Sequence, residues 1–107
     1  MIEPAALPST AFKVLTAAQW AQWQADGLFR GAPIDLADGY IHLSAIEQLQ
    51  GTLDKYFAGQ TGLVIAEVDL ALLGAAVRWE ESRGGALFPH VYGLLPLTAV
   101  INLEERP

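Results

Sequence analysis

Two histidines and a few polar and aromatic neighbours are the residues of this sequence best suited to chemistry. Tyr40, His42 and Ser44 follow one another at a spacing of two. Since side chains alternate along a strand, Tyr40 and His42 are expected on one face, with Ser44 capping a following helix. A phosphate at that helix N-terminus would meet unpaired N–H groups and the imidazole of His42. The same spacing also describes a half-buried strand histidine and an ordinary helix cap, which is the commoner case.

A second group of candidate residues lies later in the chain. Arg78 and Glu80 stand on either side of a tryptophan, so they are expected to share the strand face opposite the core. An exposed pair of this kind would contribute at most about 1 kcal/mol. Phe88, His90 and Tyr92 would also share a face, which suits a heterocycle or a sugar but also resembles an ordinary sheet edge.

We predict that the two groups meet in one cleft. The expected catalytic residues are His42, Glu80 and His90, and the expected ligand-binding residues are Tyr40, Ser44, Arg78, Phe88 and Tyr92. No spacing supports a metal site built from the histidines, and the motifs of serine hydrolases, P-loops and dinucleotide-binding loops do not occur.

Composition narrows the class of protein. The chain has 107 residues, of which 52% are hydrophobic, and this predicts a single domain, 1–107, with a packed core. It contains no cysteine, and neither a signal peptide nor a run long enough to cross a membrane is recognisable, so a cytoplasmic protein is expected. The net charge of -6 argues against duplex nucleic acid as a partner and leaves a small-molecule ligand open.

The order of apolar patterns and turn residues predicts an α+β domain. Residues 1–9 are expected to form an irregular leader, and residues 28–38 an irregular link that ends in a tight turn at Asp38 and Gly39. The expected strands are 11–15, 40–43, 63–69, 77–80, 88–93 and 99–103.

Two helices are expected, each opened by a capping box. The first starts at Thr16, with Gln19 as its partner, and ends at Gly27. The second starts at Ser44, with Glu47 as its partner, and ends at Gly59. The second helix is expected to bury the side chains of Ile46, Leu49, Leu53 and Phe57.

Four sequence blocks together resemble the bacterial family called domain of unknown function 952. The blocks are F-K-V-L-T from Phe12, G-Y-I-H-L-S from Gly39, R-W-E from Arg78 and F-P-H-V-Y-G from Phe88. The resemblance implies a fold similar to that of the ADP-ribosyltransferases: two small packed β-sheets with flanking helices around a cleft that holds NAD. It also implies that His42 contacts a ribose of that ligand. The sequence departs from the transferase pattern because it has no S-T-S strand followed by an E-x-E loop.

Two classes of function follow from these features. In the enzyme class, NAD or a related phosphorylated nucleoside lies between His42 and His90, Arg78 neutralises phosphate, and Glu80 orients a ribose hydroxyl. In the second class, the cleft binds a small ligand or a peptide without turnover. The incomplete transferase pattern favours binding, whereas the concentration of titratable residues favours chemistry.

Overall fold

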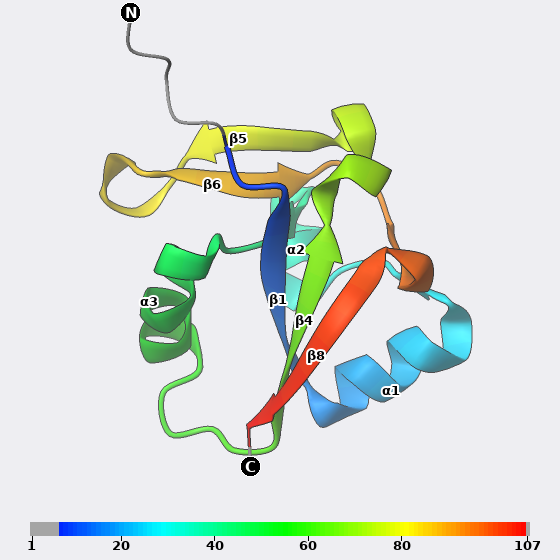
Figure 1. Ribbon diagram of the computed structural model, residues 1–107. Helices are drawn as coiled ribbons and strands as arrows, with labels where there is room; N and C mark the ends of the chain where they lie inside the picture. Colours follow the sequence, from blue (N-terminus) through cyan, green and yellow to red (C-terminus); the bar gives the residue numbers. More distant parts are fainter. Residues whose placement is uncertain (1–6, 107) are drawn as a thin grey trace, which may run out of the picture.

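A three-stranded antiparallel sheet forms one half of the protein. Its middle strand β4 (Leu63–Asp69) is almost wholly apolar, as a strand covered on both faces requires. Strand β1 (Thr10–Thr16) pairs with one edge of β4 and strand β8 (Val100–Arg106) with the other (Figure 1). The computed structural model describes residues 7–106, apart from the side chain at position 83.

A second three-stranded antiparallel sheet lies across one end of the first (Figure 1). Its middle strand β6 (Leu87–Val91) pairs with β3 (Ile41–His42) on one side and with β5 (Val77–Glu81) on the other. The two short strands β2 (Leu28–Phe29) and β7 (Leu95–Pro96) form a separate antiparallel pair.

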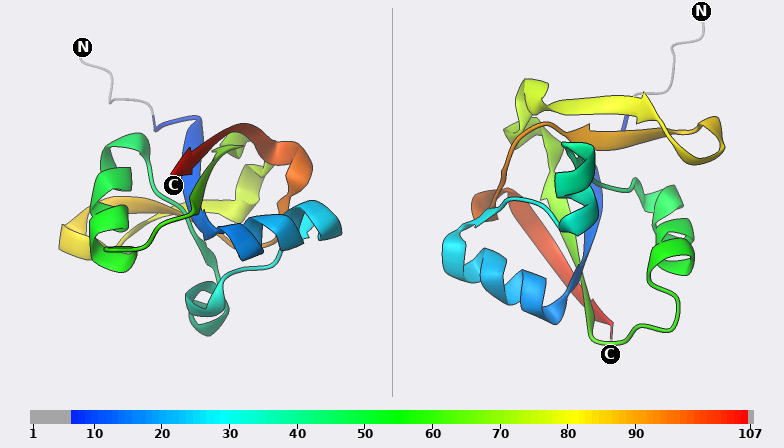
Figure 2. Two further views of the ribbon diagram at one scale, coloured as in Figure 1. Left: turned by 90° about the horizontal axis from the view of Figure 1, so that it is seen from below. Right: turned by 180° about the vertical axis from the view of Figure 1, so that it is seen from behind.

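Three α-helices of the described residues accompany the sheets: α1 (Ala17–Asp26), α2 (Pro33–Asp38) and α3 (Ile46–Tyr56). Helices α1 and α3 lie on opposite sides of the first sheet, and α2 lies behind it (Figures 1 and 2). The main core surrounds Trp23, whose side chain is 1% exposed, and a smaller core lies beneath α3. The α+β class predicted from the sequence is therefore correct, and the protein consists of small antiparallel sheets with three helices.

The predicted start of the first helix is confirmed. The Thr16 hydroxyl accepts a hydrogen bond from the backbone N–H of Gln19, and the Gln19 side chain accepts one from the N–H of Thr16. Gly27 ends the helix in the left-handed conformation, with φ 73°. Residues 7–9 form neither helix nor strand, and residues 1–6 of the expected leader lie outside the described part of the chain.

The expectation of an irregular link at 28–38 is wrong, because this stretch contains β2 and α2. Helix α2 begins with Pro33 at its first turn, and the Asp35 carboxylate accepts the N–H of Ala32 at 2.7 Å. Gly39 is the left-handed C-cap of this helix rather than part of a hairpin turn. A helix of six residues is too short to show a 3.6-residue period, so the sequence pattern could not reveal it.

The predicted strand 40–43 is shorter than expected, and its end joins the two sheets. Ile41 and His42 pair in register with β6, and the N–H of Leu43 also donates to the carbonyl oxygen of Pro89. Beyond them, Ser44 pairs with Phe12 of β1 through two backbone hydrogen bonds of 2.7 and 2.9 Å. The chain therefore leaves one sheet at His42 and reaches the other at Ser44, which places both side chains where the sheets meet.

The predicted cap of the second helix is wrong by one residue. Ala45 is the N-cap, and its backbone N–H is bound by the side chain of Gln48 at 2.9 Å, so Glu47 has no capping role. Leu49 and Leu53 are buried as expected, and Phe57 packs beside them. Ile46, which was expected to be buried, is 63% exposed.

Candidate functional site

Strand pairing brings five of the predicted site residues, His42, Arg78, Glu80, Phe88 and His90, onto one face of the second sheet. His42 pairs with His90, and His90 pairs in turn with Arg78. Glu80 pairs with Phe88 two positions further along, which puts it on the same face. The two imidazole rings meet edge to face, with centroids 5.5 Å apart. Residues 48 positions apart in the chain thus form a histidine pair.

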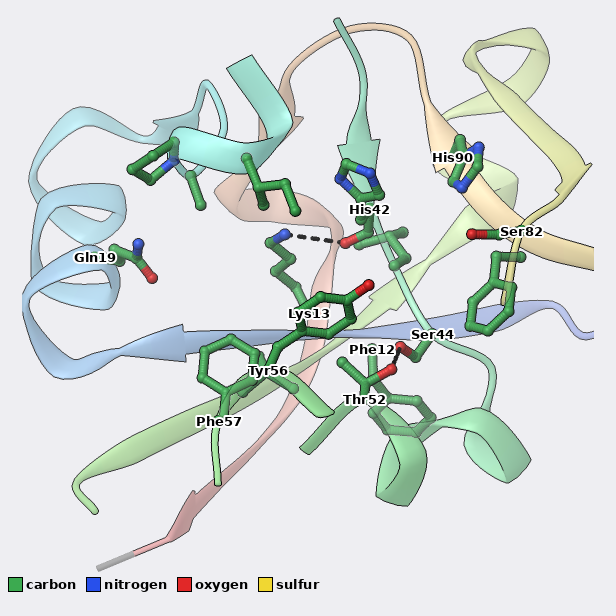
Figure 3. Close-up of a pocket in the computed structure, with 16 residues that line it drawn as sticks. Phe12, Lys13, Gln19, His42, Ser44, Thr52, Tyr56, Phe57, Ser82 and His90 are labelled. Carbon is green, nitrogen blue, oxygen red and sulfur yellow. Dashed lines mark hydrogen bonds between the residues drawn. The ribbon is translucent and has the colours of Figure 1, made fainter. Parts of the chain in front are cut away.

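A cleft of about 320 Å³ opens beside this histidine pair, between the two sheets and helices α2 and α3. Figure 3 shows Phe12, Tyr56 and Phe57 on the side of the cleft away from the histidines. The predicted site residues that line the cleft are His42, Ser44, Phe88 and His90. The others, Tyr40, Arg78, Glu80 and Tyr92, lie on the same sheet face without lining the cleft.

His42 is held by carboxylates at both ring nitrogens. Its Nδ1 lies 2.7 Å from Oδ1 of Asp35, and its Nε2 lies 2.9 Å from Oδ2 of Asp38. An ionised carboxylate can only accept, so both contacts are hydrogen bonds only when the ring carries two protons. The backbone N–H of His42 also donates to Asp35 at 3.0 Å. His42 is therefore rigidly placed, with both ring nitrogens engaged.

Beneath His42, Asp35 and Lys13 form a buried ion pair. The Nζ of Lys13 lies 2.9 Å from Oδ2 of Asp35. It also lies 3.0 Å from the carbonyl oxygen of His42 (Figure 3). Burial alone would raise the pKa of Asp35, but the hydrogen bond from His42 and the charge of Lys13 outweigh it and lower this pKa to about 2. Burial lowers the pKa of Lys13, and the charge of Asp35 opposes that shift.

His90 is oriented differently. Its Nδ1 lies 2.8 Å from Oε1 of Glu80, and the Tyr92 hydroxyl donates to the same oxygen at 2.7 Å. These hydrogen bonds, from Tyr92 first and His90 second, lower the pKa of Glu80, and the pKa of Tyr92 is raised by its bond to Glu80. The proton of a neutral His90 ring is therefore assigned to Nδ1. Among the described residues no hydrogen-bond partner occupies Nε2, so this atom is an acceptor at the cleft.

Three side chains form what we call the outer ledge: Tyr40, Tyr92 and Arg78. The Tyr40 ring stacks on His90 with centroids 4.2 Å apart and lies 5.2 Å from the Tyr92 ring. The Arg78 guanidinium carbon is 4.7 Å from the centre of the Tyr92 ring. The outer ledge therefore continues the surface of the histidine pair toward solvent, as an aromatic stack that ends in a cation.

Ser44 does not cap α3 as predicted, although it lines the cleft. It is buried, and its Oγ lies 2.6 Å from the Thr52 hydroxyl on α3 (Figure 3). We expect Ser44→Ala to lower the free energy of unfolding by about 1 kcal/mol, because one buried hydrogen bond is lost. A double-mutant cycle with Thr52→Val, followed by urea unfolding, should show coupling between the two positions. Additive losses would mean that the hydroxyls do not interact.

Sequence reasoning missed three functional candidates: Lys13, Asp35 and Asp38. A signal for Lys13 was present in the sequence. Lys13 lies two positions from both Ala11 and Leu15, so it shares their strand face, and both of these residues are fully buried. A lysine in phase with a core strand needs a buried counter-ion. Nothing comparable marks Asp35, because its contact with Lys13 joins positions 22 apart and its contacts with His42 depend on the path of the chain from α2 to β3.

The site contains few groups for a metal. Among residues 7–106 no three His, Asp or Glu side chains are arranged to hold a metal ion. None of the helices in this range is long and apolar enough to cross a membrane. The described geometry thus offers hydrogen-bonding and aromatic groups to a ligand.

The fold and cleft define a small α+β domain with an aromatic-walled cleft at the junction of two sheets. Residues 14–103 match the family described as Protein of unknown function (DUF952), and the chain therefore belongs to this family. This confirms the family resemblance seen in the sequence blocks.

Solved structures of a Caulobacter crescentus protein, CC0527, are similar to the whole domain. The crystal structure is 46% identical with a TM-score of 0.86, covering 89% of this chain and 83% of that chain. The solution NMR structure is 45% identical with a TM-score of 0.81, covering 92% and 84% respectively. No curated protein matches the chain.

Proposed function

We propose that the cleft binds the nucleoside portion of NAD or of a related phosphorylated nucleoside, as in ADP-ribosyltransferase-like proteins. The observation that carries this proposal is the histidine pair at the end of an aromatic-walled cleft, with each ring oriented by a carboxylate. Aromatic walls suit a planar base, and imidazole nitrogens suit ribose hydroxyls. The junction of two small antiparallel sheets also agrees with the ADP-ribosylation-like fold that the resemblance implies.

His90 is the residue best placed to take a proton. In the enzymatic form of the proposal, the bond between nicotinamide and C1′ of the ribose breaks, and its electron pair leaves with nicotinamide. An acceptor hydroxyl, or water, attacks C1′ and transfers its proton to Nε2 of His90. Glu80 acts through His90 rather than on the ribose, because its Oε1 already accepts from His90 and Tyr92.

A binding module for a small ligand or a peptide is the second candidate. The observation in its favour is that both ring nitrogens of His42 contact carboxylates. His42 is then a fixed part of the wall and has no nitrogen left for proton transfer.

Calorimetric titration with nicotinamide riboside tests the binding proposal. We expect binding by the wild type and about tenfold weaker binding by His90→Asn, which can still donate near Glu80 but has no atom at the position of Nε2. Tyr92→Phe removes the other hydrogen bond to Glu80 and leaves Nε2 of His90 in place, so we expect a smaller loss of affinity than in His90→Asn. No binding by the wild type would contradict the proposal.

Incubation with NAD then separates the two candidates. Chromatography over hours should show released nicotinamide if the cleft is catalytic, and the release should be lost in His90→Asn. Binding of the riboside without any release of nicotinamide from NAD would favour the binding module.

A further inference from the structure

Among the described side chains, none offers an unpaired cation to a phosphate in the interior of the cleft. Lys13 lines the cleft, but its Nζ is bound to the Asp35 carboxylate and to the carbonyl oxygen of His42. The His42 ring lies between the carboxylates of Asp35 and Asp38. The positive charges that line the cleft are therefore already neutralised by carboxylates, and a phosphate that entered it would lose its hydration without meeting a free cation among the described side chains. A neutral ring, or a ring whose positive charge is delocalised, loses less hydration.

An unpaired cation lies just outside the cleft, on the outer ledge. Arg78 is exposed and stands directly across the β5/β6 pair from His90. Among the described residues no carboxylate forms an ion pair with it, whereas Arg30 and Arg106 are paired with Asp26 and Glu104. The Tyr92 ring beneath its guanidinium is fixed by the hydroxyl bond to Glu80, which limits the positions that Arg78 takes up.

The size of the cleft indicates which part of a ligand it encloses. Its volume of about 320 Å³ is at the lower end of ligand pockets, which span roughly 300 to 1,000 Å³. A base with its ribose fits such a volume, and a whole dinucleotide exceeds it. A phosphorylated nucleoside must therefore leave its phosphates outside.

We infer that the cleft encloses a neutral or positively charged base and its ribose, and that the first phosphate passes His90 and is bound by Arg78 on the outer ledge. This inference rests on the proposed function. It adds the charge of the enclosed base and the edge of the cleft at which the phosphate emerges. Arg78 is then the residue that distinguishes a nucleotide from the corresponding nucleoside.

The cleft has another edge from which phosphates could emerge, and it supplies a matched control. Tyr56 lines the cleft and is 48% exposed, and Nζ of Lys55 lies 5.5 Å from the centre of its ring. Lys55 is exposed, and among the described residues no carboxylate forms an ion pair with it. Lys55→Ala and Arg78→Ala therefore each remove one exposed positive charge, at different edges of the cleft.

The test compares nicotinamide riboside with nicotinamide mononucleotide, which differ by one phosphate, in calorimetric titrations at low salt. For the wild type we expect the mononucleotide to bind at least tenfold more tightly, as one charge-assisted contact gives about ten- to a hundredfold. In Arg78→Ala the ratio of the affinity for the mononucleotide to that for the riboside should fall to near one. The affinity for the riboside itself should stay within about twofold of the wild-type value. In Lys55→Ala the ratio should remain as in the wild type.

A second comparison tests the charge inside the cleft. Nicotinic acid riboside carries a carboxylate in place of the carboxamide, so we expect it to bind at least about tenfold more weakly than nicotinamide riboside. Equal binding of the two ribosides would overturn the charge assignment. Two results would show that the phosphate does not lie at Arg78. One is a mononucleotide-to-riboside affinity ratio that falls in Lys55→Ala but not in Arg78→Ala. The other is an equal loss of affinity for both ligands in Arg78→Ala. Failure of every riboside to bind would overturn the proposed function as well.

Discussion

Replacing Asp35 by alanine is expected to lower the free energy of unfolding by about 3–5 kcal/mol, because it leaves Lys13 charged and buried without its partner. Asp35 is 1% exposed and also accepts the backbone N–H groups of Ala32 and His42. Small domains are stable by only about 5–15 kcal/mol, so this loss is a large share of the total. Urea unfolding followed by circular dichroism measures it.

Two further variants test whether burial of the Lys13–Asp35 pair causes the large loss of stability in Asp35→Ala. Asp26→Ala breaks the exposed pair with Arg30, whose Nη1 lies 3.3 Å from the Asp26 carboxylate, and should cost less than about 1 kcal/mol. The double variant Lys13→Met with Asp35→Leu removes both buried charges and should recover part of the loss. A cost for Asp35→Ala as small as that for Asp26→Ala would contradict the role of the buried pair.

Lowering the pH is expected to remove the contribution of Asp35 to the free energy of unfolding within a defined range. The pKa of Asp35 is about 2 in the folded protein, against an ordinary value of 3.8 for this side chain. The folded state therefore holds the carboxylate form more strongly, and the stabilisation is complete above pH 3.8 and lost as the pH falls through 2. The difference corresponds to about 2 kcal/mol.

Carbon NMR of the side-chain carboxyl group measures this titration directly. The Asp35 resonance should move with a midpoint near pH 2, and the amide signals of Ala32 and His42 should move with it because both N–H groups donate to this carboxylate. A midpoint near 3.8 would show that the hydrogen bonds and the ion pair do not hold Asp35 in its charged form. Urea unfolding of the Lys13→Met and Asp35→Leu double variant should show a smaller loss of stability over the same range.

Local patterns were sufficient for the start of α1 and for the strand face that carries Arg78 and Glu80. Thr16 and Gln19 lie on adjacent turns, so their spacing revealed the start of α1. The alternation of strand residues placed Arg78 and Glu80 on one face because that alternation is a property of the backbone itself. The same rule failed to locate the helix start after Ser44, where Gln48 rather than Glu47 binds the first N–H.

The family, the α+β class and the shared face of the strand residues follow from the sequence, since each depends on neighbours within a few positions. The cleft does not, because it depends on the register that pairs His42 with His90 and on the crossing from His42 to Ser44 between two sheets. The buried pair of Lys13 and Asp35 joins residues 22 positions apart. A charged side chain in a core strand shows that a partner must exist, but only the packing of β1, α2 and β3 against one another selects which carboxylate it is.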